Sequence, residues 1–337
     1  MRIFSGIQPT GRKHLGNYIG AIRQYVEGQE RGEGIYCVVD LHAVTVAYAP
    51  AALPGYVLDT TAMLMAAGID PERCILFRQS DVHEHTELCW LLAAVTAHGD
   101  LNRMHQFRDK SATQRELISA GLFLYPVLQA ADVLAYKADE VPVGDDQRQH
   151  VELMRDIAQR FNERFGDTLV VPSHRIPQIG ARIMDLQVPE QKMSTTATSE
   201  QGTLYVLDDE PAIAKKVRSA VTDSGSDVRR APAKAGISNL IEVLAVVRGV
   251  APEAVEQEFD GGGYGSFKAA VADEVTAYLA PVRERYLELR PDEQALAEAL
   301  EAGAAKARAI ASETVAQVRE RMGVGAAAGA RPVPPAN

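Results

Sequence analysis

The stretch "PTGRKHLGNYIGAI", residues 9–22, decides the fold because it joins two segments of different periodicity. The segment before it, "RIFSGI" at residues 2–7, is short and apolar and predicts a strand. From Asn17 onward, apolar residues recur at helical spacing, at positions 18, 19, 22, 25 and 26. A strand, a glycine turn and a helix in this order predict an anion site, because a helix start offers free N–H groups and positive partial charge.

The same alternation continues through the first part of the chain. The patterns predict strands at residues 34–40, 74–77 and 168–172 and helices at residues 51–67, 85–98 and 150–166. Strand–helix repetition is typical of a parallel sheet wrapped by helices, with ligands at the carboxyl ends of the strands. The fold class is therefore predicted as α/β, with a Rossmann-like parallel-sheet domain.

The pattern becomes helical after about residue 197. We predict helices at residues 237–249, 264–289 and 292–323, which together indicate a helical C-terminal domain. Residues 324–337 lack periodicity and predict a disordered tail.

Composition limits the functional classes. A chain of 337 residues is long enough for one large and one smaller domain, and it contains no apolar run that predicts a transmembrane helix or a signal peptide. Three widely spaced cysteines argue against a disulfide framework or a Cys-pair zinc site, so we expect a reducing cytoplasm. The net charge of −10 argues against general nucleic-acid affinity but leaves room for a local basic patch.

The turn after the first strand lacks the two common phosphate-binding glycine motifs. His14 and Asn17 are the candidates to reach phosphate oxygens, and Gly16 would let a base or ribose approach the backbone. The alternative is an ordinary helix start capped by Asn17 with His14 in solvent. A second stretch, "QKMSTT" at residues 191–196, is predicted to be a polar loop with a single lysine, and by itself such a stretch is more often a surface loop.

Taken together, these stretches resemble the class I aminoacyl-tRNA synthetases. "HLGN" at residues 14–17 resembles the HIGH signature of that family, and "KMSTT" at residues 192–196 resembles its KMSKS signature. The series "IFSGIQPTG", "VVDLHAVTV", "SAGLFLYPVLQAADVL", "VPVGDDQRQHVELMRDIAQRFN", "RIPQIGARIM", "AVTDS", "GISNL" and "GYGSFKA" resembles the tryptophan-specific branch, up to about Met322.

The resemblance implies a catalytic nucleotide-binding domain at residues 1–196 with a dimer-forming insertion, and a helical domain at residues 197–323 that binds the tRNA anticodon. The implied reaction activates L-tryptophan with ATP to tryptophanyl-adenylate and transfers it to tRNA(Trp). The implied protein is a cytoplasmic homodimer without a membrane partner, whose interface is expected between about Cys89 and Tyr136.

The resemblance also implies roles for individual residues. Catalysis is assigned to Gln8, Asn17 and Lys192. The implied ATP-binding residues are Gln8, Pro9, Thr10, Gly16, Asn17, Gly144, Asp145, Asp146, Ile183, Lys192, Met193, Ser194, Thr195 and Thr196. Mg²⁺ would arrive on the ATP phosphates, with no separate metal site in the protein.

The implied tryptophan-binding residues are His42, Gln106, Tyr125, Gln129, Asp132 and Gln147. Asp132 would accept the indole N–H, and a buried acceptor of this kind discriminates strongly against phenylalanine, which leaves it unpaired. Judged without the resemblance, Asp132 could equally sit in an ion pair or a helix cap, and His42 could be a satisfied core histidine.

Two positions depart from the family pattern. Thr195 and Thr196 stand where lysine and serine are usual, so the loop brings less positive charge to pyrophosphate. Gln129 stands one helical turn before Asp132, at a position often held by methionine, and either lines the indole pocket or bonds to backbone.

Other features were interpreted as follows. His83 and His85 are two positions apart and do not face each other on a helix, so no metal site is predicted there. Trp90 is expected to pack in the core. Two basic clusters are candidate tRNA contacts, namely Lys215, Lys216 and Arg218, and Arg229, Arg230 and Lys234. The alternative is that these residues form only a solvated basic face.

Four competing functions stay open at this point. A tryptophan- or tRNA-binding paralogue that acts as a sensor is favoured by Thr195. An adenylyltransferase without a tRNA partner is disfavoured by the helical C-terminal part. The tyrosine-specific enzyme fits the motif series less well, and a duplicate enzyme that tolerates tryptophan-like inhibitors is compatible with Gln129.

Overall fold

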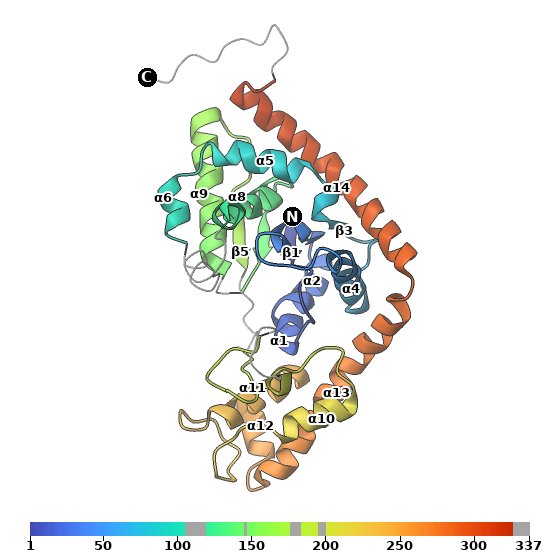
Figure 1. Ribbon diagram of the computed structural model, residues 1–337. Helices are drawn as coiled ribbons and strands as arrows, with labels where there is room; N and C mark the ends of the chain where they lie inside the picture. Colours follow the sequence, from blue (N-terminus) through green and yellow to red (C-terminus); the bar gives the residue numbers. More distant parts are fainter. Residues whose placement is uncertain (105–118, 145–146, 176–182, 195–199, 326–337) are drawn as a thin grey trace.

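The computed structural model describes residues 1–104, 119–144, 147–175, 183–194 and 200–325 (Figure 1). Its centre is a five-stranded parallel sheet in the order β3-β2-β1-β4-β5. The strands are β1 (Arg2–Ile7), β2 (Glu33–Val38), β3 (Ile75–Arg78), β4 (Glu140–Pro142) and β5 (Ser173–Arg175). The Rossmann-like α/β class expected from the alternation is confirmed.

The strand order reverses direction at β1. The chain proceeds from β1 outward through β2 to β3, and then returns to place β4 on the other side of β1. In open parallel sheets the crevice for a ligand lies outside the carboxyl ends of the strands at such a reversal. The loops that follow Ile7 and Pro142 therefore mark the expected ligand site.

The predicted strand at residues 168–172 is wrong, because a side chain captures that segment. Asn162 accepts the N–H groups of Thr168 at 3.0 Å and Leu169 at 2.9 Å, and its amide donates to the Leu169 carbonyl at 2.8 Å. These bonds fold the segment into a turn after the preceding helix. Pairing with β4 begins only at Ser173, whose N–H bonds to the Asp139 carbonyl.

Helices surround the sheet and also form a separate group at one end of the molecule (Figure 1). Those between residues 15 and 165 are α1 (Leu15–Asn17), the π-helix η1 (Tyr18–Ile22), α2 (Arg23–Gln29), α3 (Asp40–Ala43), α4 (Leu53–Ala66), η2 (Gln79–Asp81), α5 (Glu84–Ala93), α6 (His98–Asn102), α8 (Ala120–Leu134) and α9 (Arg148–Phe165). The later ones are η4 (Glu200–Gly202), α10 (Glu210–Arg218), α11 (Ala235–Arg248), α12 (Pro252–Glu258), α13 (Gly263–Leu289) and α14 (Glu293–Met322).

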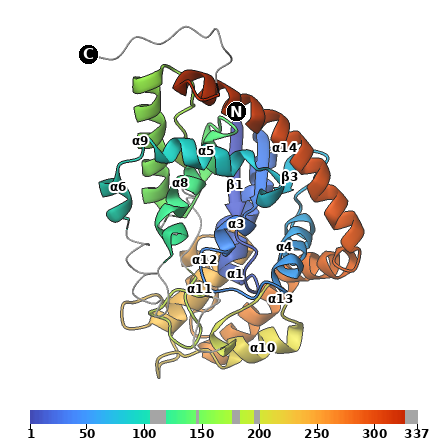
Figure 2. The same ribbon diagram turned by 45° about the horizontal axis from the view of Figure 1, so that its top comes forward.

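The last helix returns to the sheet. Figure 2 shows α14 running beside β3, away from the group formed by α10 to α13. Ala304, Ala307 and Ala311 on this helix are buried in the same core as Phe77 of β3. Thus α14 helps to cover the sheet although its sequence lies in the helical part of the chain. The division at residue 196 stays a proposal, and residues 326–337 of the expected tail lie outside the described residues.

Gly303 lies where the backbone of α14 packs against the backbone of β3. A Cβ atom at this position would lie 1.8 Å from the Leu76 carbonyl oxygen, so helix and strand would have to separate. We expect Gly303→Ala to lower the free energy of unfolding by about 3 kcal/mol, the upper end of the usual overpacking cost. Urea denaturation would measure this. Gly265→Ala on α13 is the matched control, because its Cβ would meet nothing within 4 Å, and equal stability of the two variants would contradict the prediction.

Trp90 is not a core residue. Its side chain is 76% exposed, whereas Leu88, Leu91 and Leu92 form the buried face of α5. A helix buries one stripe of its surface, and Trp90 falls outside that stripe. The expectation of core packing was wrong because an apolar residue in an apolar helix need not lie on the buried face.

Within the described ranges, no single helix is long and apolar enough to cross a membrane. The pair α11 and α12 passes that test jointly, but it bends by 107° at its break, and most apolar residues of α11 are buried in the core.

Candidate functional site

The helix after β1 begins with a reciprocal cap. His14 Nδ1 accepts the backbone N–H of Asn17 at 3.2 Å, while Asn17 Oδ1 accepts that of His14 at 3.3 Å. The cap considered in the sequence is therefore present, but His14 is 5% exposed and does not lie in solvent. Because Nδ1 is an acceptor, the proton of the neutral ring is on Nε2.

The charge state of His14 follows from its surroundings. Burial lowers the pKa of His14 to about 4, helped by the positive charges of Lys192 and Lys13. The imidazole is therefore neutral near pH 7, and it can donate one hydrogen bond from Nε2 to a ligand.

A short segment ties "HLGN" to the "KMS" part of the second signature. The Leu15 N–H bonds to the Leu204 carbonyl at 2.8 Å, and the Val206 N–H bonds to the Lys13 carbonyl at 2.9 Å. In the same segment, the Thr203 hydroxyl donates to the Ser194 carbonyl at 3.2 Å. The two stretches that the sequence paired are thus brought together.

The second signature is anchored from the helical part of the chain. The Met193 N–H bonds to the Ile183 carbonyl at 3.0 Å, and Met184 pairs with Lys192 as an isolated bridge. Asn239 of α11 accepts the Met184 N–H and donates to the Met184 carbonyl, both at 2.9 Å. The sequence analysis gave Asn239 no role, although a polar residue in so apolar a helix is a usable signal. Met193 itself faces the core, being 1% exposed.

Gly16 faces Ile183. A Cβ at Gly16 would lie 3.0 Å from the His14 ring and 3.7 Å from the Ile183 Cβ atom. The bare backbone here keeps space open between the first turn of the helix and Ile183, which the resemblance assigns to adenine. Gly144 follows β4 at the neighbouring strand end and accepts the N–H of Gln147 at 2.9 Å.

Five of the predicted site residues lie outside the described residues: Gln106, Asp145, Asp146, Thr195 and Thr196.

A second cluster is centred on the carboxylate of Asp132 on α8, which is 1% exposed. Its Oδ2 atom lies 2.8 Å from His42 Nε2. Its Oδ1 atom accepts from Gln79 Nε2 at 2.7 Å and lies 2.6 Å from His85 Nδ1. A carboxylate offers about four acceptor positions, so these three neighbours leave one on Oδ2 for a further donor.

The Asp132 carboxylate stays ionised. Burial by itself would raise the pKa of Asp132, but His42 and His85 together lower it below its usual range. Because the carboxylate only accepts, His85 must donate from Nδ1. His85 Nε2 lies 2.6 Å from the Tyr136 hydroxyl, which donates to it in the neutral ring. Gln79 and His85 were not among the predicted site residues, although His85 lies on the buried face of α5, which is a usable signal.

Three residues of α8 share one face, because they are spaced four and three positions apart: Tyr125, Gln129 and Asp132. The Tyr125 ring meets the His42 ring edge-on at 6.2 Å, and its hydroxyl lies 2.9 Å from His150 Nε2. Gln129 is half-buried, and within the described residues its amide has no hydrogen bond. Among the described residues Gln129 thus has no backbone partner, and its place in the indole pocket stays a prediction.

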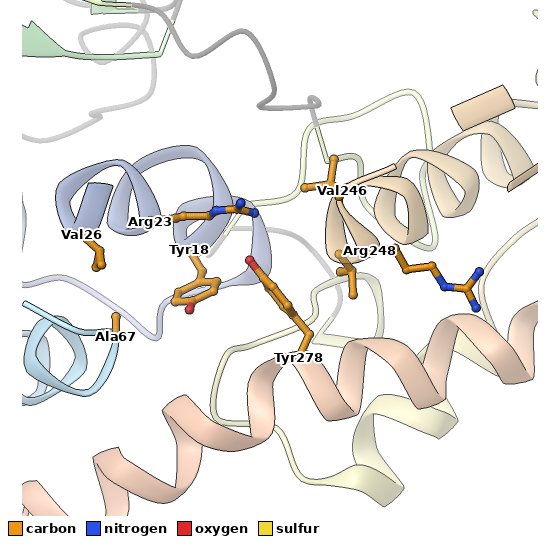
Figure 3. Close-up of a pocket in the computed structure, with 9 residues that line it drawn as sticks. Tyr18, Arg23, Val26, Ala67, Val246, Arg248 and Tyr278 are labelled. Carbon is orange, nitrogen blue, oxygen red and sulfur yellow. The ribbon is translucent and has the colours of Figure 1, made fainter. Parts of the chain in front are cut away.

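A separate pocket of about 320 Å³ lies behind the helix that starts at "HLGN" (Figure 3). Tyr18 and Arg23 of that helix point toward Tyr278 of α13, whereas Arg248 of α11 points away. The rings of Tyr18 and Tyr278 meet edge-on at 5.7 Å. The helical part of the chain thus contacts the helical segment that follows "HLGN" through Tyr278.

The basic clusters are smaller than predicted. Lys216 is 5% exposed and pairs with Asp208 at 2.6 Å, so its assignment as a tRNA contact was wrong. Arg230 forms ion pairs with Glu242, Glu253 and Glu256, so this group of side chains presents no excess positive charge to a tRNA. Lys215, Arg218 and Arg229 remain exposed, and Lys234 is half-buried against Tyr264.

Comparison with known proteins gives consistent relatives. Residues 1–280 match the family described as tRNA synthetases class I (W and Y). The chain is 49% identical to tryptophan–tRNA ligase 2 of Streptomyces avermitilis and 47% identical to tryptophan–tRNA ligase of Mycobacterium leprae, with 96% of each chain covered in both cases.

Solved structures agree with these relatives. Tryptophanyl-tRNA synthetase of Mycoplasma pneumoniae superposes with a TM-score of 0.89 at 34% identity, over 96% of this chain and 98% of that one. The Campylobacter jejuni synthetase complexed with ADP and tryptophan gives a TM-score of 0.81 at 35% identity, over 96% and 100%.

Proposed function

This chain belongs to the class I tRNA synthetases of the tryptophan and tyrosine group, and from that premise we propose how its residues join L-tryptophan to tRNA(Trp). The enzyme activates tryptophan with ATP, releases pyrophosphate and transfers the tryptophanyl group to tRNA. The relatives bear this name along 96% of the chain, which leaves the sensor alternative without support. The observation that carries the assignment to tryptophan is the buried Asp132 carboxylate with one acceptor position left open.

In the first step, a carboxylate oxygen of tryptophan attacks the α-phosphorus of ATP. The bond from that phosphorus to the oxygen bridging to the β-phosphate breaks, and the electron pair leaves with pyrophosphate. The attacking group is already ionised, so the protein supplies position and charge stabilisation rather than a base. In the second step, a tRNA hydroxyl forms the ester, AMP leaves, and the hydroxyl proton passes to phosphate or solvent.

The ATP site is proposed at the carboxyl ends of β1 and β4. The relative from Campylobacter jejuni binds ADP, and the same fold brings Gly16 beside Ile183 here. Gln8, Pro9 and Thr10 border the site from the loop after β1. Neutral His14 donates from Nε2 toward the phosphates, and Lys192 adds positive charge. Mg²⁺ is proposed to enter bound to the ATP phosphates.

The indole is proposed to lie against the shared face of α8. Its N–H donates to the open acceptor position on Asp132 Oδ2, beside His42. Tyr125 and Gln129 line the same side, and Gln147 at the start of α9 lies toward the amino-acid backbone. Because every other acceptor position of Asp132 is filled, a side chain without an N–H leaves a buried charge under-satisfied, which disfavours phenylalanine.

A direct test is tryptophan-dependent exchange between ATP and pyrophosphate, with tyrosine and phenylalanine as competing substrates. We expect exchange with tryptophan alone, followed by aminoacylation of tRNA(Trp). Exchange supported by tyrosine would contradict the assignment, and tryptophan binding without exchange would favour the sensor.

We propose that the enzyme is a cytoplasmic homodimer whose interface lies between about Cys89 and Tyr136. Trp90 supports this, because an aromatic side chain that is 76% exposed gains by being covered. Trp90→Glu is expected to shift the protein toward monomer, as measured by sedimentation at several concentrations. Trp90→Phe, which keeps an apolar ring, is the matched control. A wild-type protein that is a stable and fully active monomer would contradict the dimer.

We propose that residues 197–323 hold the anticodon stem through Lys215, Arg218 and Arg229, with unpaired bases splayed onto the helices. The double variant Lys215→Glu/Arg218→Glu is expected to lower tRNA affinity about tenfold at low salt and to flatten the dependence on salt by about two ions. Lys306→Glu on α14 is a control with the same type of charge change. Unchanged tRNA affinity in the double variant would refute this surface.

A further inference from the structure

Lys13 lies half-buried in the loop between β1 and α1, directly before "HLGN". Its Nζ atom donates to the Gln8 carbonyl at 2.6 Å and to the Thr10 carbonyl at 3.1 Å. A lysine ammonium group has three N–H donors, so one remains for another acceptor. Both partners of Lys13 are neutral, which leaves its full positive charge in place.

The neighbouring cations differ from Lys13 in this respect. Arg12 is held by Glu200 at 2.7 Å and by Asp208 at 2.9 Å. Lys216 shares Asp208 at 2.6 Å. In the part of the chain that the structure describes, Lys13 has no carboxylate partner. Within the described residues, the Lys13 ammonium group is therefore a cation in this loop whose charge no carboxylate balances.

Lys13 also shares a neighbour with the lysine of the second signature. The pKa of His14 falls to about 4 through burial and through the charges of Lys192 and Lys13, so both ammonium groups act on the same imidazole. The two lysines come from opposite ends of the catalytic part of the sequence. Both charges therefore act on the ring that we place against the ATP phosphates.

The leaving group creates a need for a second cation. When the bond to the α-phosphorus breaks, the electron pair stays on pyrophosphate, and preorganised charges next to it lower the barrier most. The loop at residues 192–196 brings only Lys192, because Thr195 and Thr196 are neutral.

We propose that Lys13 is a catalytic residue that contacts the pyrophosphate moiety of ATP and, together with Lys192, stabilises the charge that develops on it. Lys13 keeps its proton throughout and takes part in no covalent step. This inference rests on the proposed function and adds a residue to its site. The alternative, which we call the loop clip, is that Lys13 only holds the loop in place by binding the Gln8 and Thr10 carbonyls.

Four proteins separate these roles in single-turnover adenylate formation: wild type, Lys13→Met, Thr195→Lys and the double variant. If Lys13 supplies charge, Lys13→Met lowers the rate about 100-fold. Thr195→Lys then changes the wild-type rate less than about fivefold but raises the Lys13→Met rate at least about tenfold, because a new cation substitutes for the lost one. If Lys13 only held its own loop in place, a lysine at position 195 would not restore the rate.

Thermal melting checks that each variant is folded, and two further variants serve as controls. Lys13→Arg retains the charge and is expected to stay within about tenfold of wild type, while Lys306→Met on α14 is expected to match wild type. A Lys13→Met rate within about threefold of wild type would overturn the proposal. Equal loss in Lys13→Met and in the double variant would overturn it in favour of the clip.

The pH profile is an independent readout. Burial lowers the pKa of Lys13 to about 8. The cation is therefore present below pH 8 and is lost as pH rises through it, so kcat/KM for ATP should fall above pH 8. The Lys13 ammonium group itself contacts the neutral carbonyls of Gln8 and Thr10. Arg12, the preceding residue in the chain, is ion-paired with Glu200 and Asp208, and Asp208 also pairs with Lys216.

Lys13→Arg should remove this decline, because arginine stays charged over the whole range. An unchanged decline in Lys13→Arg would count against the proposal. A wild-type protein without tryptophan-dependent exchange would refute the proposed function itself. An active wild type with an active Lys13→Met would refute only the role of Lys13.

Discussion

Asp132→Asn is expected to lower kcat/KM for tryptophan by about 10²- to 10³-fold, with little change in the Kd of ATP. The asparagine side chain has one oxygen and one NH₂ group, whereas donors approach both oxygens of the Asp132 carboxylate. Its oxygen is best placed where Oδ1 was, because Gln79 and His85 both donate there. The NH₂ group then takes the place of Oδ2, and His42 can accept from it by changing tautomer.

This arrangement accounts for the size of the effect. The indole N–H meets an NH₂ group where it met a carboxylate, so a charge-assisted bond of about 1.5–3 kcal/mol is lost and a buried donor is left unpaired. Asp156→Asn, the same change on the exposed face of α9, is the matched control. A loss below about fivefold, or an equal loss in tryptophan and ATP binding, would show that Asp132 does not receive the indole. The ratio of tryptophan to phenylalanine activation should fall with it.

Lys192→Ala is expected to lower the single-turnover rate of adenylate formation by about 10²- to 10³-fold, the usual cost of removing a preorganised donor. The bridge between Met184 and Lys192 and the two Asn239 bonds hold the backbone here, so the side chain can be removed without releasing this part of the loop. The rate should therefore fall more than the affinity for ATP. Equal changes in both would indicate ground-state binding only.

The companion variant at the neighbouring loop position is Thr195→Lys, which should raise the rate only modestly if another cation already compensates. A rise of about a hundredfold would contradict compensation, because that is the uncompensated value.

The sequence alone specified those features that depend on local order along the chain. Apolar periodicity located β1, β2, β3 and most helices, because a strand or helix must turn one set of side chains inward whatever its partner is. The family was identified by the resemblance of "HLGN", "KMSTT" and the accompanying motif series to its signatures, since such motifs are consecutive residues that can be read along the chain. Where a side chain competed for backbone groups, as Asn162 does before β5, periodicity misplaced the strand.

Only the tertiary structure decided which side chains meet. The Asp132 carboxylate gathers His42 of α3, Gln79 of η2 and His85 of α5, from positions 90, 53 and 47 residues away along the chain. Packing of α8 against those elements fixes their distances, and no local pattern encodes it. For the same reason, the sequence pattern did not predict the burial of Lys216, the exposure of Trp90 or the packing of α14 against β3. Which face of a helix is covered, and which charge is paired, depends on neighbours that the chain supplies from elsewhere.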